Sequence, residues 1–303
     1  MLNERLKENK FKRALVVPFR GIVKLISKKA YISFQYKYIT HHKLDWKKLS
    51  RYTEKLQYLR LYVYPNWPDV SQCAGRVGVR EYVKEKGLED ILIKTYGVYN
   101  SFDEIDFEKL PNAFAMKCSH GCAMNYICFD KSKANKEELK KKFDKWLKTN
   151  YGKKTVELHY SHIKPQIIVE ELMLDNGKLP TEYKIHVFNG KARNLYVVTA
   201  RGVDIRYSNY YIDWTEFDGS QFNGWRKTDY PLQKPDNFDE MIKISEALAS
   251  PFPFVRVDLY NINGTIYFSE MTFTPAKGTL ILDDDKCDFE MGEWLDISKY
   301  RKN

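Results

Sequence analysis

From about residue 113 onward, apolar and polar side chains alternate along several segments with the two-residue period of β-strands. The pattern predicts strands at residues 113–117, 126–130, 165–170, 181–188, 191–199, 254–260 and 265–272. Asn189 and Gly190 separate two of these strands, and an Asn-Gly pair is a strong hairpin signal. Residues 261–264, which end on Gly264, predict a second hairpin. The strands of each pair are therefore expected to run antiparallel.

Helical spacing of apolar residues predicts helices at residues 52–62, 76–86, 135–151 and 237–249. Asn135 is the expected N-cap of the third helix, and Gly152 is its expected end. Residues 91–94 predict a short strand, whereas residues 201–235 are aromatic and are expected to be rich in loops. Because hairpins alternate with helices and no internal repeat occurs, the pattern indicates an α+β fold.

Composition adds size, charge and compartment. The chain has 303 residues, 43% of them hydrophobic, which suits a folded enzyme-sized protein. Its net charge of +10 favours anionic partners: nucleotides, nucleic acids, acidic polymers or a lipid surface. Five cysteines include no CxxC pair, and the pair Cys118 and Cys122 lacks the second pair that a zinc site needs. Reduced thiols in a cytoplasmic protein are the expected state.

The basic N-terminal segment leaves two interpretations open. No apolar run reaches the roughly 18 residues that cross a bilayer. Residues 14–26 are apolar, but Pro18, Arg20 and Lys24 interrupt them, and further lysines flank them. This segment either packs on the body of the protein or, over residues 10–29, lies as an amphipathic helix on an anionic membrane surface.

The last hairpin carries the most informative polar residues. Because side chains alternate faces along a strand, Arg256 and Asp258 share one face, as do Glu270 and Thr272 on the partner strand. The short turn makes the strands neighbours, so Asp258 and Glu270 can meet. Two carboxylates among apolar residues are costly unless they bind something, and Mg²⁺ with phosphate oxygens would satisfy them. A solvated outer face explains the pattern equally well.

Three further groups are weaker signals. Lys117 opens a turn of small residues that can bind phosphates through charge and backbone N–H groups, although an ordinary hairpin is the simpler interpretation. Glu182 and Lys184 share a strand face, which is either solvated or in contact with ribose and phosphate. Glu170 and Glu171 end a strand and either face solvent or contact adenine and ribose.

The order of these groups resembles the ATP-grasp superfamily. The stretch from Phe254 to Pro275 is similar to the TupA-like branch, which is associated with teichuronopeptide, capsule and other surface-polysaccharide synthesis. Supporting similarity lies at residues 52–61, 78–87, 110–121 and 182–190. The resemblance runs from about residue 40 to about residue 280 and implies an ATP-grasp fold, in which two α+β lobes with antiparallel sheets grip the nucleotide.

The resemblance also implies site residues. The expected ATP-binding residues are Lys94, Lys117, Ser119, His120, Gly121, Glu170, Glu171, Leu172, Glu182 and Lys184. The expected metal ligands are Asp258, Glu270 and Thr272, the last at a position where the superfamily usually has Asn. The expected catalytic residues are Arg256 and Lys184, and the substrate candidates are Arg76, Arg80 and Arg201. The cofactors implied are ATP and Mg²⁺.

Four regions are expected: a basic helical segment (1–45), a substrate or linker region (46–110), a small lobe with the phosphate loop (111–172) and a large lobe with the metal-binding hairpin (173–303). The expected function is ATP-dependent ligation of a carboxylate and an amine through an acyl-phosphate, in the synthesis of a surface polysaccharide. The expected partners are a small-molecule carboxylate with an amine or sugar. A sugar kinase, a glycosyltransferase and a non-catalytic polyanion-binding module are the alternatives, and nucleic acid is not an expected partner.

Overall fold

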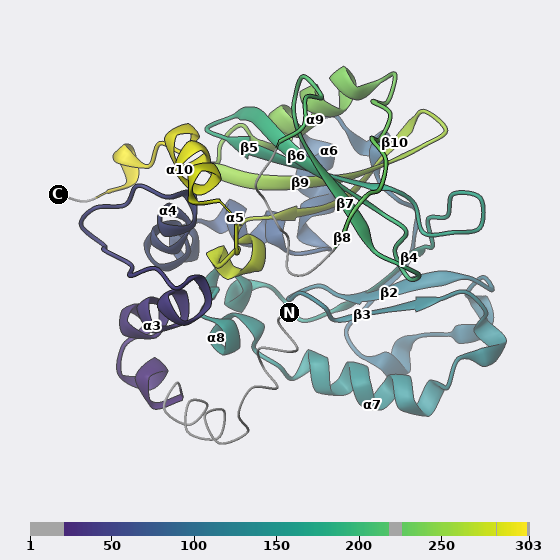
Figure 1. The fold of residues 1–303 in the computed structure, drawn as a ribbon. Helices are drawn as coiled ribbons and strands as arrows, with labels where there is room; N and C mark the ends of the chain where they lie inside the picture. Colours follow the sequence, from purple (N-terminus) through teal and green to yellow (C-terminus); the bar gives the residue numbers. More distant parts are fainter. Residues whose placement is uncertain (1–20, 218–225, 283, 302–303) are drawn as a thin grey trace.

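The computed structural model describes residues 21–217, 226–282 and 284–301, whose strands form two sheets, one above the other in Figure 1. The sheet orders are β1-β4-β2-β3 and β10-β9-β5-β6-β7-β8. The strands are β1 (Thr95–Tyr99), β2 (Phe114–Cys118), β3 (Asn125–Cys128), β4 (Ile167–Glu171), β5 (Glu182–Phe188), β6 (Lys191–Thr199), β7 (Arg206–Tyr211), β8 (Arg226–Lys227), β9 (Phe254–Ile262) and β10 (Thr265–Thr272). The helices are α3 (Lys28–Thr40), α4 (Tyr52–Tyr58), α5 (Pro68–Ala74), α6 (Gly78–Glu85), α7 (Lys136–Leu147), α8 (Tyr151–Thr155), α9 (Phe238–Ala249) and α10 (Asp285–Trp294).

The four-stranded sheet is covered on one face by α7, below it in Figure 1. Phe114 and Met116 of β2 belong to the same buried apolar cluster as Phe143 of α7. Because side chains alternate along a strand, Ala115 and Lys117 point to the opposite face, toward the larger sheet.

The six-stranded sheet buries its apolar face against α9. Ile185 of β5 and Val257 of β9 share a core cluster with Met241 and Leu248 of α9. The opposite face carries the polar side chains of these strands, including Lys184 of β5. Each sheet thus turns a polar face toward the other.

The last hairpin sets the register of the expected metal residues. Asn263 and Gly264 have φ of 52° and 81°, the left-handed pair that a tight Asn-Gly hairpin turn requires. Glu270 lies directly opposite Asp258 in the β9–β10 ladder. A bulge falls between Phe268 and Glu270, so Ser269 is an extra residue on its strand.

The helical region before the first sheet packs against one end of the large sheet. The Tyr52 ring at the start of α4 lies 5.6 Å from that of Phe188 and 5.0 Å from that of Phe254, centroid to centroid. Arg60 is fully buried and donates to the carbonyls of Val156 and Lys277, both at 2.9 Å. These contacts attach the helical region to the large sheet and to the segments around Val156 and Lys277.

The α+β prediction and both hairpins are confirmed. The predicted strand at residues 91–94 is wrong, because Glu89–Ile91 forms a 3-10 turn and Leu92 makes a single bridge to Phe268. The predicted helix 135–151 ends earlier, at Leu147. A separate helix, α8, follows and contains Gly152, where a Cβ would lie 2.3 Å from Ser161 Oγ. The region 201–235, expected to be rich in loops, also includes β7.

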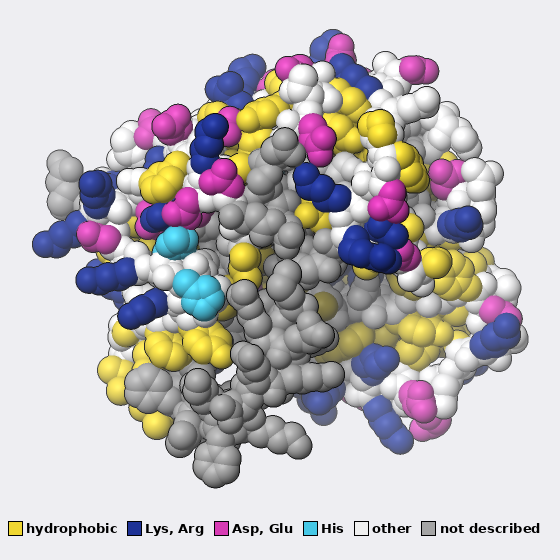
Figure 2. Space-filling model, viewed as in Figure 1, with side chains coloured by type: hydrophobic (Ala, Val, Ile, Leu, Met, Phe, Trp, Pro, Cys, Tyr) yellow, Lys and Arg dark blue, Asp and Glu magenta, His cyan; other side chains and the backbone are white. Residues whose placement is uncertain are grey.

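The N-terminal expectation is described in part, because residues 10–20 lie outside the described residues. Residues 21–26 are helical, and Ile22, Leu25 and Ile26 are 57%, 85% and 80% exposed. Hydrophobic side chains are visible at the lower left of Figure 2, where the purple N-terminal helical segment of Figure 1 lies. Lys24 Nζ donates to the carbonyls of Lys153 (3.3 Å) and Lys154 (3.4 Å), which ties the segment to α8. No helix in the described ranges is long and apolar enough to cross a membrane.

The expected region boundaries stay predictions. The small sheet takes β1 from the segment 46–110 and its other strands from the segment 111–172, because β1 pairs with β4.

Candidate active site

A cavity of about 390 Å³ lies between the two polar sheet faces. Its walls come from β2 and β3 of the small sheet, from the segment around the end of β4, and from β5, β9 and β10 of the large sheet. The helical region contributes Arg76. Four cationic side chains (Arg76, Lys117, Lys184 and Arg201) and three carboxylates (Glu171, Glu182 and Glu270) line it. This mixture of cationic and anionic side chains suits a multiply charged anion that is bound together with a metal cation.

One part of the cavity wall is apolar. Ile93, Ala115, Leu172, Met173 and Leu179 line it. Strand β4 ends at Glu171, so the backbone groups of Leu172 and Met173 lie beyond the sheet ladder. An apolar wall beside unladdered backbone groups can hold a planar, hydrogen-bonding ring.

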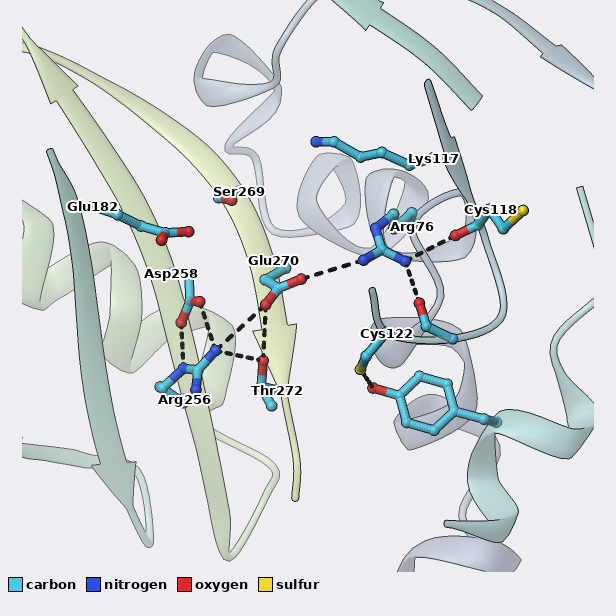
Figure 3. A network of polar contacts seen from close by, with 12 residues as sticks. Arg76, Lys117, Cys118, Cys122, Glu182, Arg256, Asp258, Ser269, Glu270 and Thr272 are labelled. Carbon is cyan, nitrogen blue, oxygen red and sulfur yellow. Dashed lines mark hydrogen bonds and ion pairs between the residues drawn. The ribbon is translucent and has the colours of Figure 1, made fainter. Parts of the chain in front are cut away.

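A buried charge network lies under the floor of the cavity (Figure 3). The carboxylate of Asp258 is fully buried and accepts from Arg256 Nε at 2.6 Å, from Arg256 Nη2 at 2.7 Å and from Lys184 Nζ. Burial raises the pKa of Asp258, although Arg256 and Lys184 oppose the shift. Arg256 also donates to the hydroxyls of Tyr196 (2.7 Å) and Thr272 (3.0 Å). Removing one partner would leave an uncompensated buried charge, so the network holds its members in place.

Glu270 extends this network into the cavity. Its Oε1 lies 3.4 Å from Arg256 Nη2, and its Oε2 lies 3.7 Å from Arg76 Nη2. Burial alone would raise the pKa of Glu270, but Arg76, Lys184 and Arg256 outweigh it and lower the pKa to about 2. The Glu270 side chain is 36% exposed, so its carboxylate is both ionised and accessible.

Arg76 links this carboxylate to the β2–β3 turn. Its Nη1 donates to the carbonyls of Cys118 (2.8 Å) and Gly121 (2.5 Å), as the dashed lines of Figure 3 show. The Arg76 backbone N–H donates to Ser119 O at 3.2 Å. One arginine from the helical region therefore fixes the turn beside Glu270.

Two further groups of ion pairs, one around Glu170 and one around Glu182, flank the cavity. Lys117 Nζ lies 2.8 Å from Glu170, which also faces Arg80 at 3.4 Å. Burial alone would lower the pKa of Lys117, but Glu170 and Tyr260 outweigh it and raise the pKa. On the opposite wall, Glu182 contacts Lys184 (3.0 Å) and Arg201 (2.5 Å). Lys117 and Lys184 are thus held as cations on facing walls.

The fit of a divalent metal follows from these contacts. Glu270 is accessible, ionised and opposite Asp258, which suits a Mg²⁺ ligand. Asp258 is fully buried and its two oxygens accept hydrogen bonds from Arg256 and Lys184, so a metal reaches this carboxylate only when one of these cations moves. No cluster of three His, Cys, Asp or Glu side chains suited to a metal occurs in the part of the chain that the structure describes. The donor set therefore fits a metal that phosphate oxygens also coordinate.

Several predicted residues do not line the cavity. Lys94 is exposed, with its Nζ 5.5 Å from the Tyr96 ring centroid. Ser119 is buried and its hydroxyl donates to Lys164 O at 2.6 Å. His120 is also buried, with Nε2 3.1 Å from Trp146 O. Gly121 lines only a small adjoining cavity.

Other predicted residues stand behind the wall. Glu170 and Arg80 act on Lys117 from behind, and Thr272 contacts Arg256 and Glu270. The residues that the structure brings together at the cavity are Arg76, Lys117, Glu171, Leu172, Glu182, Lys184, Arg201 and Glu270, with Arg256 and Asp258 directly beneath.

Sequence reasoning missed part of the wall. Ala115, Asn125 and Ile127 line the cavity, and strand alternation from Lys117 could have found Ala115. No sequence pattern indicated Tyr196 or Ser269. Tyr196 contacts Arg256 only because β6 lies near β9 in the sheet, and Ser269 is the extra residue of a bulge.

Comparisons with known proteins place the chain in a family. No curated protein matches the sequence. Among solved structures, D-alanine–D-alanine ligase from Bacillus anthracis, complexed with ATP, is similar at 13% identity over 75% of this chain and 65% of that chain, with a TM-score of 0.44. D-alanine–D-alanine ligase from Helicobacter pylori shows 14% identity over 82% and 67%, with a TM-score of 0.43. L-amino acid ligase from Bacillus licheniformis shows 12% identity over 75% and 55%, also with a TM-score of 0.43.

These similarities are distant, and the chain spans between about half and two thirds of the length of these structures. The family match is more extensive. The model of the TupA-like ATP-grasp family matches residues 54–296, which include both sheets and the helices α5 and α6. The chain therefore belongs to the TupA-like ATP-grasp family.

Proposed function

We propose that this protein is an ATP-dependent carboxylate–amine ligase that acts in the synthesis of a cell-surface polysaccharide. Membership of the TupA-like ATP-grasp family supports the ligase class. The resemblance of residues 254–275 to the TupA-like branch supports the polysaccharide setting. The observation that carries the chemistry is the network of Asp258, Arg256 and Lys184 beneath an accessible Glu270, with Lys117 on the facing sheet.

The cavity suits a nucleoside triphosphate in size and polarity. Its volume of about 390 Å³ lies within the usual range of small-molecule sites, about 300–1,000 Å³. The adenine would lie against the apolar wall near Leu172, and the phosphates would extend toward Lys117, Lys184 and Arg76. Mg²⁺, when bound with the nucleotide, would be held by Glu270 and by a released Asp258, and it would supply neutralisation of phosphate charge.

The reaction proposed has two steps. A substrate carboxylate oxygen attacks the γ-phosphorus, and the bond between the γ-phosphorus and the bridging β-phosphate oxygen breaks. The products of this step are ADP and an acyl-phosphate. An amine nitrogen then attacks the acyl carbon, the C–O bond to phosphate breaks, and inorganic phosphate and one amine proton depart. Arg256 would stabilise negative charge near the transferred group from the position in which Asp258 holds it, and Lys184 would do so once it leaves Asp258 for the phosphates.

The substrates proposed are an amino acid and a sugar acid or amino sugar, joined as an amide. Arg201 is a substrate candidate from the cavity wall, although in the structure it pairs with Glu182 at 2.5 Å. A substrate carboxylate would compete with Glu182 for this guanidinium.

A cytoplasmic location at the inner membrane face completes the proposal. All five cysteines are free, which suits a reducing compartment. The exposed Ile22, Leu25 and Ile26 lie beside Lys24 and Lys28, a combination that suits an anionic lipid surface.

The test is incubation of the purified protein with Mg-ATP, amino acids and uronic-acid sugars, with ADP and the coupled product read out together. ADP with an amide product supports the ligase. ADP with a phosphorylated sugar and no amide would favour a kinase and refute the proposal. A Lys184→Met variant, which removes one buried cation, should form no product.

A further inference from the structure

A second, larger hollow lies outside the nucleotide cavity. This groove has a volume of about 730 Å³ and runs between the start of α5, the start of α6 and the segment that leads into β4. None of the residues that line it also lines the nucleotide cavity. Neither the family match nor the sequence pattern assigns it a role.

The lining of the groove is rich in neutral hydrogen-bonding groups. Asn66, Gln72 and Gln166 contribute amides, and Trp67 contributes a partly exposed ring. The amide contacts are long: Gln72 Nε2 lies 3.5 Å from Gly78 O, and Gln166 Nε2 lies 3.3 Å from Asn100 Oδ1. These weak contacts can be exchanged for ligand hydroxyls at little cost.

Trp67 is held in place from one side. Its ring centroid lies 5.5 Å from that of Phe252 and 6.0 Å from that of Tyr300. Within the described residues, its indole N–H has no hydrogen-bond partner. A fixed aromatic ring with a free donor suits the apolar face and the hydroxyls of a sugar ring.

The charge of the groove narrows the ligand class. No carboxylate lines it, whereas Lys164 and His162 do, and both are exposed. Lys164 makes no ion pair with any described residue. A nucleic acid would require several cations, and a neutral ligand would require none. One lysine beside several amides suits a sugar that carries a carboxylate.

The groove adjoins the phosphate end of the nucleotide cavity. Gly75 lines both the groove and a small cavity of about 10 Å³. That small cavity shares Arg76, Cys122 and Glu270 with the nucleotide cavity. A Cβ on Gly75 would lie 3.0 Å from Ile163 Cγ2, so a larger residue would crowd this junction.

From this geometry we infer that the groove binds a segment of an acidic oligosaccharide next to the reaction site. The role of the groove rests on the proposed function: the groove would hold one part of a sugar chain while the reacting unit of that chain lies in the nucleotide cavity. The binding itself is independent of turnover and can be measured without nucleotide.

The experiment is calorimetric titration of the full-length protein with trigalacturonate, without ATP. Lys164→Glu should weaken binding by about tenfold, because an attraction becomes a repulsion. The control is Lys141→Glu, the same charge change at an exposed residue of α7 outside the groove, which should bind like the unaltered protein. Gln72→Ala should weaken binding by about threefold through loss of a hydroxyl contact.

The probes separate the parts of the inference. Maltotriose, which lacks carboxylates, should bind at least about tenfold more weakly, and a short polyglutamate should bind no better than maltotriose. Equal binding of trigalacturonate and polyglutamate would overturn the sugar assignment. Equal losses in Lys164→Glu and Lys141→Glu would overturn the groove as the site. Trigalacturonate binding without ADP formation would support the groove and count against the ligase reaction alone.

Discussion

Arg76 is expected to couple the helical region to catalysis, and its replacement by alanine tests this directly. The substitution removes two hydrogen bonds from a charged group to the carbonyls of Cys118 and Gly121. Each such bond contributes about 1.5–3 kcal/mol. Water can replace part of this at a side chain that is 16% exposed, so we expect a loss of about 2–3 kcal/mol in unfolding free energy.

For a domain of this size, that loss corresponds to a fall of about 5 °C in melting temperature. The turn would also lose its fixed position beside Glu270, so ADP release should fall by about tenfold to a hundredfold. Arg76→Lys keeps the charge but cannot bond both carbonyls in the same way. Its melting temperature and activity should therefore lie between those of the unaltered protein and Arg76→Ala.

The matched control is Arg80→Ala. Arg80 is 18% exposed and also donates to a carbonyl, that of Ile93 at 2.7 Å, but it does not line the cavity. It should lose stability with a smaller effect on turnover. Thermal denaturation and a coupled ADP assay give both quantities. If Arg76→Ala and Arg80→Ala lose activity equally, or Arg76→Ala melts like the unaltered protein, the coupling described above is wrong.

Four further outcomes are expected. Asp258→Asn should lower the unfolding free energy by about 3–5 kcal/mol, measured by denaturant unfolding, because Lys184 and Arg256 lose their buried anion. The pKa of Glu270 is lowered from 4.5 to about 2, so its stabilisation is full above pH 4.5 and lost as the pH falls toward 2; the stability gap between the unaltered protein and Arg76→Ala should narrow over that range. Burial raises the pKa of Asp288 from 3.8 to about 6, so protonated Asp288 favours the folded state. The unfolding free energy should therefore decline by up to about 3 kcal/mol as the pH rises from 3.8 through 6. Asp288→Asn should lack this decline. Leu25→Glu, at a side chain that is 85% exposed, should leave the melting temperature unchanged and reduce co-sedimentation with vesicles of anionic lipid.

The sequence predicted the hairpin chemistry because strand periodicity acts over a few residues. Arg256 and Asp258 share a face in any regular strand, and the short turn makes the two strands neighbours, but the bulge at Ser269 is what places Glu270 opposite Asp258. The same rule explains why Lys117 and Lys184 reach the cavity. Local pattern was sufficient wherever the element was regular and its partner was its chain neighbour.

Long-range contacts set the rest of the site. Ser119 and His120 turn inward because the segments at Lys164 and Trp146 accept their hydrogen bonds, which no local pattern shows. Arg76 reaches the β2–β3 turn across 42 residues of sequence. The Arg256–Asp258–Lys184 network also differs from the expected open metal site, because Lys184 and Arg256 donate hydrogen bonds to the Asp258 carboxylate that was expected to bind the metal.

The central claim is that Glu270, beside the buried network, binds the metal–nucleotide complex. Calorimetric titration of Mg²⁺ with a non-hydrolysable ATP analogue into the unaltered protein and into Glu270→Gln tests it most directly. The unaltered protein should bind the analogue only with Mg²⁺ present, and the variant should lose at least about tenfold in that Mg²⁺-dependent affinity. Equal Mg²⁺-dependent binding by both proteins would contradict the assignment of Glu270.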